Sequence, residues 1–141
     1  YGWHTPGIWK KPLLWSLYVS LLFIDLGFLL FALNAVIGVP RLLAVHAFAV
    51  GGVGLITLAM MSRVSLGHTG REIGQPPLTA SIALGILILA AVFRVIVPIF
   101  AIQQYPLWIA ISQGLWILAF ALFTLRYLPI LIAPRVDGRP G

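Results

Sequence analysis

The stretch "LLWSLYVSLLFIDLGFLLFALNAVI", residues 13–37, contains one charged side chain in twenty-five residues and decides the class of protein. A bilayer core about 30 Å thick is crossed by an α-helix of about 20 apolar residues. Three further runs meet this requirement, at residues 42–61, 78–101 and 107–128. The whole chain is 61% hydrophobic and 9% charged, well outside the usage of soluble domains. We therefore predict an all-α fold, an integral membrane bundle of four transmembrane helices.

Helix-breaking residues separate these runs and suggest a simple organisation. Pro12 precedes the first run, Gly38 and Pro40 follow it, and Pro106 separates the third run from the fourth. The short turns imply antiparallel neighbours. We expect an N-terminal segment at residues 1–12, a transmembrane domain at 13–128 and a tail at 129–141.

The distribution of basic residues predicts the orientation. Seven lie on one side of a four-helix topology: Lys10, Lys11, Arg63, Arg71, Arg126, Arg135 and Arg139. Only Arg41 lies on the other side, and Arg94 lies within a span. Because basic loops stay in the cytoplasm, both termini are expected there. The net charge of +6 thus reflects topology, and we expect a lipid bilayer and no nucleic acid as partner.

Two charged side chains lie inside the predicted spans. An ionised carboxylate such as Asp25 near the centre of a span costs about 2.5–3.5 kcal/mol, so it must be neutral, paired or hydrated. At 1.5 Å per residue, Asp25 lies about 18 Å and Arg94 about 24 Å from the cytoplasmic ends of their helices, and an arginine side chain can cover this difference. The alternatives are a structural ion pair, a proton relay, or a clamp of Arg94 on an anionic cofactor group.

The third span predicts the direction of Arg94. Four alanines fall within about 60° of it at 100° per residue: Ala80, Ala83, Ala90 and Ala91. Small residues allow membrane helices to approach closely, so Arg94 should point into the protein. Counted from the outer helix ends, His46 lies about 6 Å deep, Gln113 about 9 Å deep and Arg94 about 10 Å deep. These three side chains should form one polar layer.

His46 has two interpretations. It is either a hydrogen-bonded structural residue or a ligand, since neutral imidazole binds iron and copper and Arg94 could pair with a haem propionate. The nearby Gly51 and Gly54 permit close approach by another helix or by a flat macrocycle. Thr57 continues the helix face of His46. The absence of cysteine excludes disulfides, thiolate metal sites and c-type haem attachment.

The segment "HAFAVGGVGLITLAMMSRVSLGHTGR", residues 46–71, closely resembles the signature of the NnrS family of bacterial inner-membrane proteins. The preceding "PLLWSLYVSLLFIDLGFLL" and the following "AAVFRVIVP" resemble the family in order and spacing, so the likeness covers nearly the whole chain. The positions that match are His46, Gly51, Gly54, Arg63, Leu66, Gly67, His68, Thr69, Gly70, Arg71 and Arg94. Family members usually have more spanning helices, so the chain resembles the carboxy-terminal part of such a protein.

The resemblance implies a multi-pass protein of the bacterial inner membrane that is associated with haem and copper, with denitrification and with nitric oxide stress. It also implies, as partners, the remaining helices of a longer protein or other membrane subunits. We expect haem b as cofactor and copper as a second candidate. The expected cofactor-binding residues are His46, Arg94, Gly51, Gly54 and Thr57, and the expected metal ligands are His46 and His68.

The polar stretch "SRVSLGHTGREIGQPP", residues 62–77, is expected to be the loop between the second and third spans. Arg63, His68 and Arg71 suit an anion or metal site on the cytoplasmic side, and the alternative is a solvated basic loop that only sets topology. The 22 residues of nearly continuous helix between His46 and His68 separate them by roughly 33 Å, so the two histidines cannot share one metal.

Three functional hypotheses follow. The first is a haem-associated protein of the NnrS type in nitric oxide stress or respiratory nitrogen-oxide metabolism. The second is a small transporter or channel in which Asp25, Arg94 and His46 line a proton or anion path. The third is a structural subunit of a larger membrane assembly. No motif of the sequence identifies catalytic residues, so the hypotheses leave open whether the protein is an enzyme.

Overall fold

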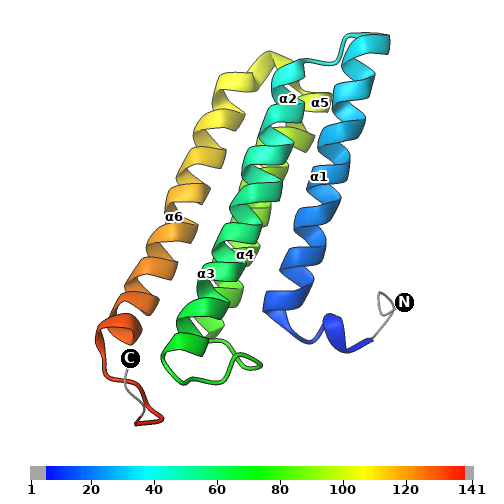
Figure 1. Cartoon of the computed structure of the whole chain (residues 1–141). Helices are drawn as coiled ribbons and strands as arrows, with labels where there is room; N and C mark the ends of the chain where they lie inside the picture. Colours follow the sequence, from blue (N-terminus) through cyan, green and yellow to red (C-terminus); the bar gives the residue numbers. More distant parts are fainter. Residues whose placement is uncertain (1–5, 139–141) are drawn as a thin grey trace.

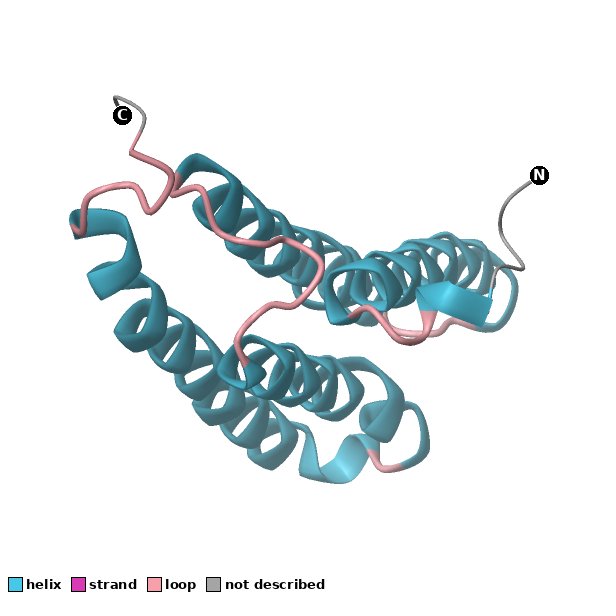
Figure 2. Ribbon diagram, turned by 90° about the horizontal axis from the view of Figure 1, so that it is seen from below, coloured by secondary structure: helices cyan, strands magenta, loops and turns pink. Residues whose placement is uncertain are grey.

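The computed structural model describes residues 6–138 of the chain. Within this range four helices are long and apolar enough to cross a membrane: Pro12–Ile37, Arg41–His68, Leu78–Phe100 and Ile102–Ile132. The beginning of the first and the end of the last lie at the same end of the bundle (Figure 1). Loops alone connect the helices, and the described residues contain no strand (Figure 2). The all-α bundle of four spans is confirmed. Arg139, one of the seven basic residues used to predict the orientation, lies outside the described residues.

The spans are built from shorter elements. The first is α1 (Pro12–Ile37), preceded by the short turn η1 (Pro6–Ile8). The second comprises α2 (Arg41–His46), the π-helical segment η2 (Ala47–Gly54) and α3 (Leu55–His68). The third comprises α4 (Leu78–Ala91), the π-helical segment η3 (Val92–Ile96) and α5 (Val97–Phe100). The fourth comprises the turn η4 (Ile102–Gln104) and α6 (Tyr105–Ile132).

The second span is longer than its apolar run. Residues 62–68, which were expected to begin the loop, are the last turns of α3. Ser62 and Ser65 are buried there, because small polar side chains pack between helices as well as alanine does. The connecting loop therefore comprises only residues 69–77.

The first and the last span pack against different neighbours. α1 packs on α2, η2 and α3, whereas α6 packs mainly on α4 and less on α3. In the most apolar window of each span, 50% of residues are buried in the second span but only 22% in α1 and in the fourth span. Thus α1 and α6 flank the other two spans (Figure 1). Many of their large apolar side chains are exposed.

The core confirms the alanine stripe of the third span. Its predicted members are all buried: Ala80, Ala83, Ala90 and Ala91. Leu84 and Leu87 lie in the same cluster, together with Phe123 from α6. Close packing of α4 against its neighbours therefore follows from small residues on one face.

The interface between α1 and η2 is a reciprocal fit of rings and glycines. Phe23 of α1 occupies the space where a Cβ of Gly51 would be, and Phe48 of η2 occupies that of Gly27. Phe48 also stacks edge-on against the ring of Phe28, with 5.0 Å between ring centroids. Gly51 therefore serves the close approach of another helix, one of the two alternatives raised by the sequence.

Candidate functional site

His46 is held by a hydrogen bond that joins two spans. It is the last residue of α2 and is half-buried. Its Nδ1 and the hydroxyl of Tyr105, the first residue of α6, are 3.1 Å apart. Within the described part of the chain Nε2 has no hydrogen-bond partner. Since hydrogen bonding at one ring nitrogen orients the imidazole, Nε2 is the nitrogen left to meet a ligand.

Arg94 lies in η3 with its guanidinium directed at α6. Its Nη1 donates to the carbonyl oxygen of Ile109 at 3.3 Å, while its Nε is buried without a hydrogen-bond partner among the described residues. A buried charged donor left unpaired is costly, because it has given up water without replacing it. Arg94 therefore has unused capacity to bind an acceptor. The segment η3 also packs against α2, the helix that ends at His46.

A cavity of about 200 Å³ adjoins Arg94, and Val50, Ser112, Gln113 and Trp116 complete its lining. Ser112 is fixed by a hydrogen bond from its Oγ to the carbonyl oxygen of Ala90, at 2.8 Å. Arg94 of η3 and Gln113 of α6, which were predicted to share one depth, thus line the same cavity. Together with His46 and Tyr105 they make up what we call the outer polar cluster.

Both π-helical segments belong to this region. η2 begins directly after His46, η3 contains Arg94, and the two segments pack against each other. π-Helical turns are rare and occur often at functional sites, where they change the direction of side chains. Neither these segments nor the roles of Tyr105 and Ser112 were predicted from the sequence. Tyr105 lies just outside the apolar run 107–128, where membrane proteins concentrate tyrosine and tryptophan.

Other residues expected at the cofactor site lie apart from the cavity. Gly51 packs against Phe23, Gly54 is buried within its own span, and Thr57 is exposed on α3. None of the three lines the cavity beside Arg94. Their spacing from His46 suggested that they could contact the same cofactor. Which residues of other spans lie opposite them depends on how the spans pack.

The expected ion pair between Asp25 and Arg94 is not formed. Asp25 is exposed on the outer side of α1, and the one ion pair within residues 6–138 lies elsewhere. The two depths were compatible, but α1 packs on the second span and Arg94 faces α6. Two side chains at compatible depths do not meet when each points away from the helix that carries the other.

The three residues expected to form a loop anion site divide between two surfaces. Arg63 and His68 are exposed on α3 and line one groove, whereas Arg71 lines a separate hollow with Arg126. The cause is the turn at Gly70, which ends α3 with a φ of +72° and sends the chain in a new direction. Arg63 and His68 are helical residues, so they do not follow this turn.

No metal centre is assembled by histidine and acidic residues in the described range. Within residues 6–138 no three side chains of His, Cys, Asp or Glu lie close enough together to hold one ion. His46 and His68 end α2 and α3 of the same continuous span, so they lie apart, as their spacing predicted. Any metal at His46 would need its other ligands from a cofactor or from another chain.

Comparison with known proteins agrees with the motif. The family described as NnrS protein matches residues 1–135, nearly the whole chain. No curated protein and no solved structure gives a significant match. With a family match of this extent and four helices able to cross a membrane, the chain is a membrane protein that belongs to the NnrS family.

Proposed function

We propose that this protein binds haem b at the outer polar cluster, with His46 as an iron ligand, and acts in nitric oxide stress or respiratory nitrogen-oxide metabolism. The observation that carries the proposal is that two side chains, His46 and Arg94, each have a nitrogen without a hydrogen-bond partner among the described residues. His46 is oriented through Nδ1, which leaves Nε2 available, and Arg94 has a buried Nε without a partner. The haem and the nitric oxide role rest on the resemblance to the family.

The chemistry of the donors fits a haem. Imidazole is a common axial ligand of haem iron, and an arginine guanidinium pairs well with a carboxylate such as a propionate. The cavity of about 200 Å³ is smaller than typical small-molecule sites of about 300–1,000 Å³, so it suits a carboxylate-sized group. Apolar surface is available beside His46, because Leu42, one turn earlier, and Val45 are exposed.

Each residue then has a separate task. His46 would hold the iron, and the hydroxyl of Tyr105 would keep its ring orientation and tautomer. Arg94 would hold and neutralise the acidic edge of the cofactor. When bound, haem iron supplies a coordination position for a small diatomic molecule such as nitric oxide. Copper stays a second candidate for the same imidazole nitrogen.

The alternatives differ in what they require. A proton or anion path through Asp25, Arg94 and His46 is not proposed, because Asp25 is exposed and forms no ion pair with Arg94 within residues 6–138. A purely structural subunit would need no ligand at His46. We further infer from the seven basic residues that both termini lie in the cytoplasm. The location in the bacterial inner membrane rests on the resemblance to the family.

Absorption spectroscopy tests the cofactor. We expect the full chain, purified from haem-supplied cells, to show a Soret band that shifts on adding nitric oxide to the reduced protein. His46→Ala should abolish this band, and Tyr105→Phe should shift it. The matched control is His68→Ala, which removes an exposed histidine at the far end of the same span and should leave the spectrum unchanged.

Three results would overturn the assignment. A Soret band that persists unchanged in His46→Ala would exclude His46 as ligand, and its loss in His68→Ala would move the site to the other end of the span. Absence of any band in the correctly inserted wild-type chain would contradict haem binding by this chain and would favour the hypothesis of a structural subunit. Far-UV circular dichroism of each variant checks that the helices are intact.

A further inference from the structure

A second site lies at the opposite end of the bundle from the outer polar cluster. We propose that the hollow between the loop of residues 69–77 and α6 binds a phosphate group, with Arg71 and Arg126 as its cationic donors. The hollow has a volume of about 420 Å³. Its apolar floor includes Leu66 and Ile130, and the side-chain amide of Gln75 also lies in its wall.

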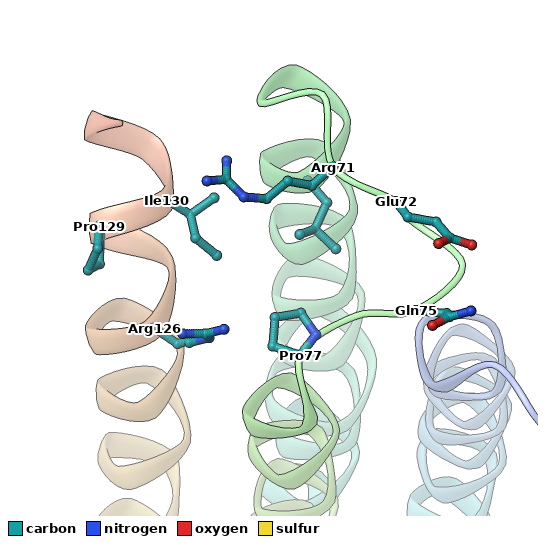
Figure 3. A pocket seen from close by; sticks show the side chains of 8 residues that line it. Arg71, Glu72, Gln75, Pro77, Arg126, Pro129 and Ile130 are labelled. Atoms are coloured by element: carbon teal, nitrogen blue, oxygen red, sulfur yellow. The ribbon is translucent and has the colours of Figure 1, made fainter. Parts of the chain in front are cut away.

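Arg71 provides the first argument. Its guanidinium extends from the loop toward α6 (Figure 3). Its Nη1 is buried and has no hydrogen-bond partner among the described residues. A charged donor that has lost water and found no acceptor is destabilising unless a ligand supplies one. Arg71 is thus prepared for an acceptor from outside the described chain.

The charges around the hollow favour an anion. Arg126 projects from α6 into the same space, and the single carboxylate in the wall, that of Glu72, points away from both arginines (Figure 3). The only ion pair in the described chain joins Arg135 to Asp137, so it involves neither arginine of the hollow. Hydrogen bonding to Asp137 raises the pKa of Arg135. Two guanidinium groups therefore face the hollow, and the one carboxylate in its wall is turned away from them.

The position of the hollow favours phosphate as the anion. It lies where α4 begins and α6 ends, at one end of two helices long enough to cross a membrane. Phosphate is the anionic group of the lipid headgroups expected at such an end. Guanidinium groups bind phosphate oxygens in pairs of parallel hydrogen bonds. Exposed apolar side chains adjoin the site, among them Leu78 and Leu128, which are 75% and 54% exposed. A phospholipid headgroup and a free phosphate share the chemistry that this site would recognise.

Calorimetric titration of the purified full chain in a non-ionic detergent tests the proposal. The probes are dihexanoyl phosphatidic acid and inorganic phosphate, titrated separately. Binding of the lipid alone identifies a headgroup site, whereas binding of inorganic phosphate, with competition between the two probes, identifies a site for the phosphate group itself. If neither probe binds, the proposal is wrong.

Four variants identify the residues. Arg71→Gln and Arg126→Gln should each weaken binding about tenfold, the loss expected for one charge-assisted hydrogen-bonding partner. Arg63→Gln is the matched control, because it removes an equal charge at the same membrane edge from an exposed position outside the hollow. Glu72→Gln should strengthen binding, a gain that misfolding cannot produce. Equal losses in all three arginine variants would show only general attraction to a basic surface and would overturn the proposal.

Discussion

The reciprocal fit between α1 and η2 predicts a graded response to one methyl group. A Cβ added at Gly51 would lie 2.6 Å from the Cβ of Phe23, an atom that no side-chain rotation can move. At Gly27 the added Cβ would instead meet Cε1, at 2.6 Å, and Cζ, at 2.8 Å, near the far end of the Phe48 ring. Gly51→Ala therefore forces the helices apart, whereas Gly27→Ala needs only a rotated ring.

The loss of unfolding free energy can be estimated by comparison with a glycine that has free space around it. A Cβ at Gly114 of α6 would meet nothing within 4 Å. The gain in helix propensity, about 1 kcal/mol for glycine to alanine, is similar at each site and cancels in the comparison. Overpacking costs about 1–3 kcal/mol. Relative to Gly114→Ala, we expect Gly51→Ala to lose about 2–3 kcal/mol of unfolding free energy and Gly27→Ala about 1 kcal/mol.

Unfolding of the purified variants in mixed detergent micelles, followed by far-UV circular dichroism, measures these differences. The expected order of stability is Gly114→Ala above Gly27→Ala above Gly51→Ala. If Gly51→Ala unfolds at the same denaturant fraction as Gly114→Ala, then α1 does not approach η2 through this glycine. The packing order of the spans would then have to be revised.

Three further predictions concern other contacts. Ser112→Ala should cost about 0.6–1.5 kcal/mol of unfolding free energy in the same micelle assay, because it removes the hydrogen bond to the Ala90 carbonyl oxygen. Losses from Asp25→Asn and Arg94→Gln should be additive within about 0.5 kcal/mol in a double-mutant cycle, since the two side chains do not meet, and a coupling above about 1 kcal/mol would contradict this. A cysteine at the exposed Gln104 should react with an external membrane-impermeant reagent while a C-terminal reporter stays cytoplasmic, and the opposite labelling pattern would refute the inferred orientation.

Features that depend on one helix at a time could be predicted from the amino-acid sequence. Length and hydropathy predicted four spans, because the thickness of the bilayer sets the length of each apolar run. The helical repeat predicted that the alanines of α4 would share a buried face, and the rise per residue predicted that Arg94 and Gln113 would lie at similar depth, where both line one cavity. The separation of His46 from His68 followed in the same way.

Contacts between side chains of different spans could not be predicted, because they depend on how the helices assemble. Asp25 lay at a suitable depth for Arg94, but α1 packs on the second span, so the carboxylate faces outward. Arg71 shares its hollow with Arg126, which is 55 positions later in the chain, and not with its sequence neighbour Arg63. The physical reason is that depth and helix face are local properties, whereas the neighbour of each face depends on turns such as Gly70 and on packing between whole helices.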